Sequence, residues 1–258
     1  MDLQYDGHVV LITGASRGLG FAMAQAFVGE GCRVVIGGRN PSTLEEARAR
    51  LGEPERVLPV AGDLLDDTTA TVLVDRALEA FGRVDVLVNN AAEFGHTTPL
   101  ELAYAEWESL LRLKTFGYVR MAAAAVPHIA KAGGGAILNV AGAAALRASR
   151  ESAHVGPLNA AILNWSDLLA RELAPQAIRV NVITPGPTRT HRLESRIEAM
   201  MKEGGIAREA AEEKILQSIP AGIFGNPDEI GTMAVTICSP RFRSLVGANV
   251  IIDGGKHC

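Results

Sequence analysis

The 258-residue sequence has few cysteines and no long apolar run. Cys32, Cys238 and Cys258 are an odd number without C-x-x-C spacing, which excludes a disulfide framework and favours a reducing, cytoplasmic setting. We therefore predict a cytoplasmic protein without a metal site. No apolar segment approaches the roughly 20 residues that a membrane-spanning helix requires, so we expect no membrane association.

The sequence also lacks an excess of positive charge. The net charge is −4 and the isoelectric point is about 5.9, whereas nucleic-acid-binding domains usually exceed roughly 9. We expect no nucleic-acid partner. Residues 1–7 contain two aspartates and no basic residue, so they do not resemble a secretory signal. The terminal cysteine lacks a C-a-a-X box, which excludes prenylation.

Short apolar runs rich in valine and isoleucine alternate with longer helical patterns. The predicted strands are His8–Thr13, Arg33–Gly37, Val57–Ala61, Val84–Asn89, Ala136–Val140, Arg179–Ile183 and Ala248–Ile252. The predicted helices are Gly18–Gly29, Ser42–Leu51, Asp66–Phe81, Ala103–Ala125, Pro157–Leu173 and Pro227–Cys238. Nearly continuous apolar strands are typical of parallel strands buried on both faces. We predict an α/β fold with a doubly wound parallel sheet of about seven strands, a Rossmann fold, in a single domain 1–258 with an insertion at about 190–217.

The first predicted strand leads into the motif T-G-A-S-R-G-L-G at Thr13–Gly20. Gly14 permits a tight turn, Gly18 lets the backbone approach a pyrophosphate, and Gly20 lets the helix pack closely on the strand. The helix that follows offers free N–H groups and a positive dipole end to a phosphate. The motif therefore predicts a dinucleotide site at the start of the sheet.

Further motifs follow in the expected order along the chain. They are Asp63 after strand three, N-N-A-A at 89–92, P-G-P-T-R-T at 185–190 and G-A-N-V-I-I-D-G-G at 247–255. Together with the glycine loop they resemble the short-chain dehydrogenase/reductase family over essentially the whole chain.

The resemblance implies a role in nucleotide binding for each matching position. Asp63 would bind adenine, Asn89 and Asn90 would hold the turn after strand four, and Thr188 and Thr190 would flank the nicotinamide. The cofactor residues that we infer in this way are Gly14, Ser16, Arg17, Gly18, Leu19, Gly20, Arg39, Asp63, Leu64, Asn90, Ala91, Pro185, Gly186, Thr188 and Thr190.

The end of strand two indicates which nucleotide is preferred. A free ribose 2′-hydroxyl calls for a carboxylate there, whereas a 2′-phosphate calls for a guanidinium. The segment I-G-G-R-N at 36–40 has no acid and contains Arg39, and Arg17 lies inside the glycine loop. Because two arginines suit a dianion, we predict NADP(H) rather than NAD(H). The alternative for Arg39 is a solvated charge in a turn.

The catalytic residues of the resembled family are absent. The family uses a tyrosine and a lysine four residues later on one helix, a serine thirteen residues before the tyrosine, and an asparagine on the preceding long helix. Counting along this chain places Val155, Asn159, Gly142 and Lys114 at those four positions. No tyrosine lies in residues 119–258 and no lysine in residues 132–201, so a shifted register cannot restore the pair.

Several residues are candidates to replace the missing groups. Lys114 and Asn159 have exchanged residue types relative to the family, so a cation could reach the nicotinamide ribose from the opposite helix; the alternative is a solvated or phosphate-facing Lys114. His154 titrates near neutrality, although its neighbours suggest that it points off the catalytic face. Weaker polar candidates are Ser149, Ser152 and Glu93. Arginines that could rim a pocket for an anionic small molecule are Arg147, Arg150, Arg189 and Arg192; the alternative is that they are scattered, solvated loop charges.

Three functions remain open from the sequence. The first is an NADP(H)-dependent oxidoreductase with an atypical active site, in which ordinary carbonyl reduction is weak or absent. The second is a catalytically inactive nucleotide-binding or regulatory protein, and the third is a non-redox enzyme, a lyase or cyclase, on the same fold. The family resemblance also implies a homodimer or homotetramer.

Overall fold

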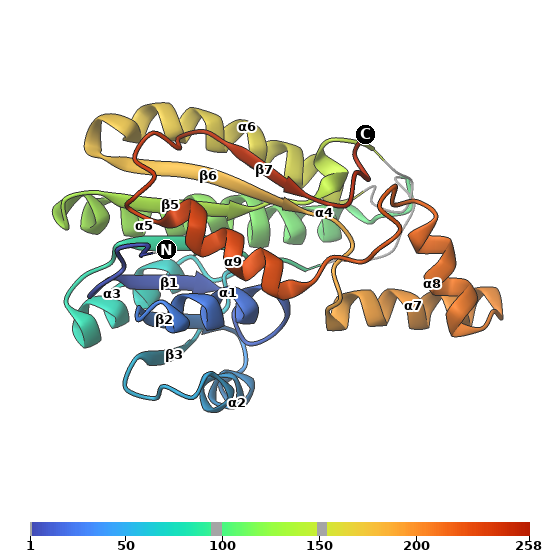
Figure 1. The fold of residues 1–258 in the computed structure, drawn as a ribbon, viewed down its shortest axis with the longest axis horizontal. Coiled ribbons are helices and arrows are strands. Elements are labelled where there is room, and N and C mark those ends of the chain that lie inside the picture. Colours follow the sequence, from blue (N-terminus) through green and yellow to red (C-terminus); the bar gives the residue numbers. More distant parts are fainter. Residues whose placement is uncertain (1, 94–99, 149–153) are drawn as a thin grey trace.

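The computed structural model describes residues 2–93, 100–148 and 154–258, and contains one parallel sheet of seven strands (Figure 1). The strand order is β3-β2-β1-β4-β5-β6-β7. The strands are β1 (Val9–Thr13), β2 (Arg33–Gly38), β3 (Val57–Ala61), β4 (Val86–Asn89), β5 (Gly135–Val140), β6 (Ile178–Pro185) and β7 (Asn249–Ile252). This arrangement confirms the predicted doubly wound α/β fold.

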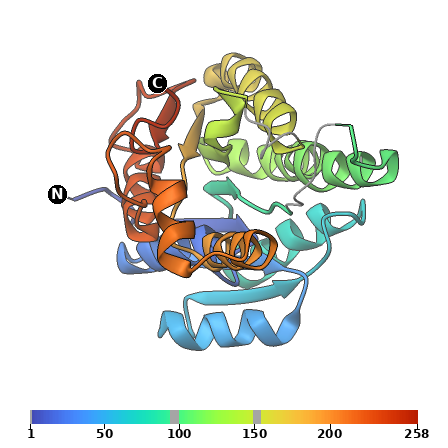
Figure 2. The ribbon, with the colours of Figure 1, turned by 90° about the vertical axis from the view of Figure 1, so that its right-hand side faces the viewer.

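Helices cover both faces of the sheet (Figure 2). They are α1 (Gly18–Gly29), α2 (Pro41–Leu51), α3 (Thr69–Phe81), α4 (Tyr104–Leu110), α5 (Gly117–Lys131), α6 (Val155–Leu173), α7 (His191–Gly204), α8 (Arg208–Leu216) and α9 (Pro227–Cys238). Successive strand residues supply the cores on opposite faces: Val10 and Ile12 of β1 pack with α1 and α9, whereas Leu11 packs with α3 and α5. Burial on both faces explains why the strands are continuously apolar.

Two predicted helices differ from the structure by more than two residues. The predicted helix Ala103–Ala125 is interrupted by η1 (Leu111–Phe116), a π-helical segment between α4 and α5. A π turn leaves no mark in a pattern that is helical throughout. Helix α3 begins at Thr69 rather than at Asp66 because the Asp66 carboxylate accepts the Thr68 N–H (2.9 Å) and holds a turn there.

The insertion after β6 forms α7 and α8, which lie beyond the end of β6 and face the viewer in Figure 2. They have a small core of their own, to which Leu193, Ile197, Ile215 and Phe224 contribute. This pair therefore stands at the carboxyl edge of the sheet, where doubly wound folds bind ligands. Among the described residues, no helix is long and apolar enough to cross a bilayer.

Candidate active site

The glycine loop joins β1 to α1, and at three positions its backbone conformation or packing disfavours any residue with a Cβ. Gly14 and Gly18 have φ of 65° and 60°, in the left-handed region that favours glycine. A Cβ on Gly20 would lie 2.3 Å from the Gly14 carbonyl oxygen. The first turn of α1 has no acidic residue and no side-chain cap, so its N–H groups are available. These features fit a pyrophosphate group of a dinucleotide.

The turn after β4 is bonded directly to this loop. Asn90 Nδ2 donates to the carbonyls of Thr13 and Gly14, both at 3.0 Å. Thr13 Oγ1 accepts the N–H groups of Asn90 and Ala91 at 3.0 and 3.1 Å. Asn89 points elsewhere: its Nδ2 donates to Asn139 Oδ1 at 2.9 Å. Asn90 and Thr13 thus fix the glycine loop, and the sequence interpretation had missed Thr13.

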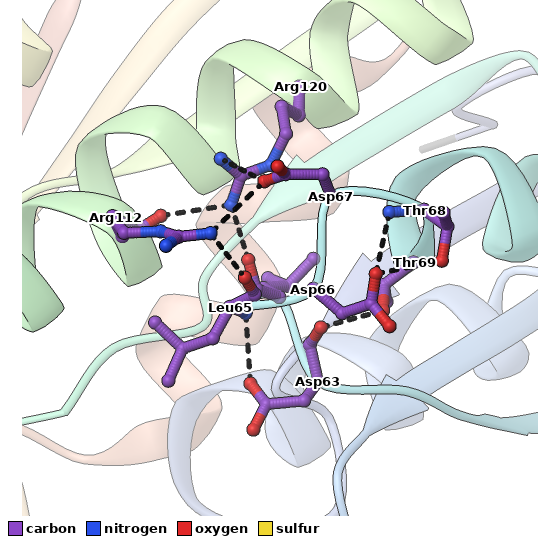
Figure 3. Close-up of polar contacts among 9 residues, drawn as sticks. Asp63, Leu65, Asp66, Asp67, Thr68, Thr69, Arg112 and Arg120 are labelled. Carbon is purple, nitrogen blue, oxygen red and sulfur yellow. Dashed lines mark hydrogen bonds and ion pairs between the residues drawn. The ribbon is translucent and has the colours of Figure 1, made fainter.

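The loop after β3 presents Asp63, the position at which the family resemblance places adenine (Figure 3). Asp63 Oδ1 accepts the Leu65 N–H at 3.0 Å, and the Asp63 carbonyl accepts Thr69 Oγ1–H at 2.6 Å. Leu64 is buried in the core between α3 and α5. The loop is therefore held at its backbone and at the side chain of Asp63.

The end of β2 carries Arg39 beside an acid that follows β4. Arg39 Nη2 lies 3.4 Å from Glu93 Oε1, and their side chains are 56% and 49% exposed. Such exposed pairs contribute at most about 1 kcal/mol. Asn40 is used differently, because its Oδ1 accepts the N–H of Ser42 at 2.9 Å and caps α2. Arg39 is the guanidinium available at this end of β2.

The four positions at which the resembled family carries its catalytic residues lie close together, and three of the four residues are buried. Lys114 on η1 is 3% exposed, and its Nζ lies 2.6 Å from Oδ1 of Asn159 on α6. A Cβ on Gly142, which follows β5, would lie 2.9 Å from Asn159 Nδ2. Val155, at the start of α6, is also buried. The solvated alternative for Lys114 was therefore wrong, and Gly142 leaves the room that Asn159 occupies.

Burial changes the acid–base properties of this cluster. Desolvation and, to a smaller extent, Arg192 lower the pKa of Lys114 to about 7. Tyr118 on α5 presents its ring 5.8 Å from Lys114 Nζ, but its hydroxyl donates to the Val140 carbonyl at 3.1 Å and burial raises its pKa. The Tyr118 hydroxyl thus has a structural role, and of these two groups Lys114 is the one whose pKa is shifted towards neutrality.

The amino end of α7 brings further positive charge to this edge of the sheet. Neighbouring protein atoms and Arg196 lower the pKa of Arg192, whose side chain is exposed to solvent. Burial, Arg17 and Arg192 lower the pKa of His191. His191 Nδ1 lies 3.8 Å from the Cβ position of Gly18. The glycine loop, α7 and Lys114 therefore share one strongly cationic environment.

Two arginines and a histidine are the remaining candidates among the described residues. Arg147 donates to the carbonyl of Cys258 at 2.7 Å, and Arg189 pairs with Glu212 at 3.9 Å and stacks over Phe224. Each of these two arginines thus has a partner distant in the sequence, and the arginine rim stays a prediction. His154 precedes α6 and is buried. Ser149, Arg150 and Ser152 lie outside the described residues.

The segment after β6 completes the edge of the site. Pro185 ends β6, and a Cβ on Gly186 would lie 2.7 Å from the Cα of Asp253. Thr188 is buried and its hydroxyl donates to the Gly186 carbonyl at 3.0 Å. Thr190 precedes α7 and has its Cβ 3.8 Å from the Cβ position of Gly18. This segment therefore lies against the glycine loop.

Comparison with known proteins agrees with this geometry. The family model described as enoyl-(acyl carrier protein) reductase matches residues 14–257. D-threitol dehydrogenase from Mycolicibacterium smegmatis is 32% identical, with 98% of this chain and 94% of that protein covered. A 3-oxoacyl-[acyl-carrier-protein] reductase from Thermotoga maritima is 28% identical, with 98% and 99% covered.

Solved structures resemble this fold closely. L-sorbose reductase from Gluconobacter frateurii, complexed with NADPH and L-sorbose, has a TM-score of 0.94 and 32% identity, with 99% of this chain and 98% of that chain covered. A variant of actinorhodin polyketide ketoreductase with NADPH has a TM-score of 0.92 and 26% identity, with 98% of each chain covered. The chain belongs to the short-chain dehydrogenase/reductase family of oxidoreductases.

Proposed function

We propose that the protein is an NADP(H)-binding oxidoreductase in which the lysine and the asparagine of the usual catalytic set have exchanged places, as Lys114 and Asn159. The observation that carries this proposal is the 2.6 Å contact between Lys114 Nζ and Asn159 Oδ1, beside Val155 and Gly142. The nicotinamide, when bound, supplies the hydride chemistry. Lys114 and Asn159 would bind the ribose and hold a proton beside it.

The properties of Lys114 suit this role. An ammonium with a pKa of about 7 exchanges its proton readily at neutral pH. The Asn159 oxygen orients the ammonium, while the Asn159 amide N–H groups are donors suited to a hydroxyl. A flexible lysine stem anchored on η1 can present its charge to the face of α6 from which the usual lysine is missing. The exchange thus offers a cation and a donor from opposite helices.

NADP(H) is the nucleotide that the charges favour. Arg39 and Arg17 are exposed, and the weak pair between Arg39 and Glu93 can give way to a 2′-phosphate, which offers a stronger charge-assisted contact. NADPH-bound relatives support the same choice. Arg196 lowers the pKa of Arg192, and Arg192 lowers the pKa of Lys114, so positive charges repel one another at this end of the site. An anionic small molecule would relieve this repulsion, and we propose that class as substrate.

Ordinary carbonyl reduction should be slow. The phenol, the lysine and the serine that assist it are all absent at their expected positions, and general acid–base assistance contributes roughly 10²–10⁴-fold. His154 remains the second candidate for proton donor. We also propose a homo-oligomer, which the exposed Leu100, Tyr104 and Phe116 support, and a reducing compartment, which the free cysteines support.

Nucleotide preference tests the first part of the proposal. Calorimetric titration should give tighter binding of NADPH than of NADH. Arg39→Asp should reverse this order, because it replaces the guanidinium that would bind the 2′-phosphate by a carboxylate that repels it. Glu93→Gln should strengthen NADPH binding by severalfold, since it removes a competitor for Arg39 of at most about 1 kcal/mol. Equal affinities for both nucleotides, or no binding at millimolar concentration, would contradict the assignment.

Turnover tests the atypical chemistry. A panel of neutral ketones and secondary alcohols, followed by nicotinamide absorbance, should give no substrate near a typical enzymatic rate of roughly 10 s⁻¹. Ketones that carry a carboxylate or a phosphate should be reduced slowly, but faster than neutral ketones. Arg192→Gln should remove this difference in rate. Rapid turnover of a neutral ketone that survives Lys114→Met and His154→Ala would show that another group is the acid.

Stability against pH tests the buried ammonium without any substrate. The pKa of Lys114 is about 7 in the folded chain and 10.5 ordinarily, so between these values the unfolded chain binds more protons and stability rises with pH. The free energy of unfolding of the wild type, relative to Lys114→Met, should therefore increase from about pH 7 to about pH 10, by up to about 1.4 kcal/mol per pH unit. A difference that does not vary with pH would mean an ordinary lysine pKa.

A double-mutant cycle tests whether the two residues act as a pair. Lys114→Asn and Asn159→Lys should each weaken NADPH binding by about 1.5–3 kcal/mol, because each removes a charge-assisted hydrogen bond. The double exchange should bind about as well as the wild type. Additive losses in the cycle would show that the residues are uncoupled, and the non-catalytic binding function would gain support.

A further inference from the structure

Two arginines of the long helical segment reach across to the loop that carries Asp63 (Figure 3). Arg112 on η1 donates from Nη2 to the Leu65 carbonyl at 3.0 Å. Arg120 on α5 donates from Nη2 to the Leu64 carbonyl. The carbonyls of two successive residues, directly after Asp63, are thus each held by a guanidinium.

The two arginines are also joined to each other. Arg120 Nη2 donates to the Arg112 carbonyl at 3.1 Å. Asp67 Oδ1 lies 3.4 Å from Arg112 Nη2 and 3.3 Å from Arg120 Nη1. The acid at the far end of the loop therefore bridges both guanidinium groups. Arg112, Arg120 and Asp67 therefore form a closed network, because each of the three contacts the other two.

Packing brings the loop and the helical segment into direct contact as well. Leu64 is buried, and its Cβ lies 3.6 Å from the Cβ position of Gly117, the first residue of α5. A Cβ at position 117 would thus stand in van der Waals contact with the loop. The arginine network thus holds the loop onto the junction of η1 and α5, three residues from Lys114.

We propose that Arg112 and Arg120 are positioning residues for the adenine half of the nucleotide. They fix the Leu64–Leu65 backbone, and through the Leu65 N–H that bonds Asp63 Oδ1 they set where the Asp63 carboxylate stands. Because they belong to the segment that carries Lys114, the adenine loop and the buried lysine share one support. This inference rests on the proposed binding of NADP(H).

Binding of a whole and of a half nucleotide distinguishes this role from a general effect on folding. Arg120→Gln and Arg112→Gln should each weaken NADPH binding about tenfold, as expected for loss of a charge-assisted bond. The affinity for reduced nicotinamide mononucleotide, which lacks the adenosine half, should stay within about twofold of the wild type. Arg120→Lys, which keeps the charge and a donor, should recover part of the NADPH affinity.

A matched control and a nucleotide-free readout complete the test. Arg76→Gln removes an exposed guanidinium on α3 that pairs with Glu79, and it should change neither affinity. Hydrogen exchange at the Leu65 amide, measured without nucleotide, should become about tenfold faster in Arg120→Gln and not in Arg76→Gln. Equal loss of both ligands, or unchanged NADPH affinity in both arginine variants, would overturn the positioning role. Failure of the wild type to bind NADPH would instead overturn the proposed function.

Discussion

A lysine ammonium buried to 3% exposure imposes the main constraint on this site. Taking such a charge out of water is costly unless fixed dipoles surround it, and here the Asn159 amide oxygen at 2.6 Å is one of them. Asn159 in turn fills space beside Gly142, where a Cβ would approach its amide to 2.9 Å. A change at any of these positions therefore alters the surroundings of the others.

The same constraint connects the chemistry to the fold. Lys114 lies on η1, whose neighbours Arg112 and Arg120 grip the loop of Asp63, while Asn159 lies on α6, which packs against β6, far along the sheet from β3 and its loop. The glycine loop is fixed independently by Asn90 and Thr13. Nucleotide, lysine and amide are thus supported by elements from both halves of the sheet, which is how a doubly wound fold builds a site at its carboxyl edge.

The sequence predicted the sheet well because burial on both faces leaves a strong signal: all seven apolar runs are strands, with ends shifted by a few residues. Counting from fixed motifs also indicated that Lys114 and Asn159 had exchanged residue types. It could not predict η1, because a π turn carries no pattern of its own. Nor could it predict that Glu93 contacts Arg39 or that Arg147 binds the carbonyl of Cys258, since these contacts join residues 54 and 111 positions apart.

In the proposed function, Lys114 supplies the ribose-binding cation from the helix opposite to the one that carries the usual lysine. A crystal structure of the NADPH complex measures this most directly. We expect Lys114 Nζ to lie within hydrogen-bonding distance, about 2.7–3.2 Å, of a hydroxyl of the nicotinamide ribose, and to keep its contact with Asn159. A complex in which Lys114 stays buried away from the ribose, while another side chain binds that hydroxyl, would contradict it.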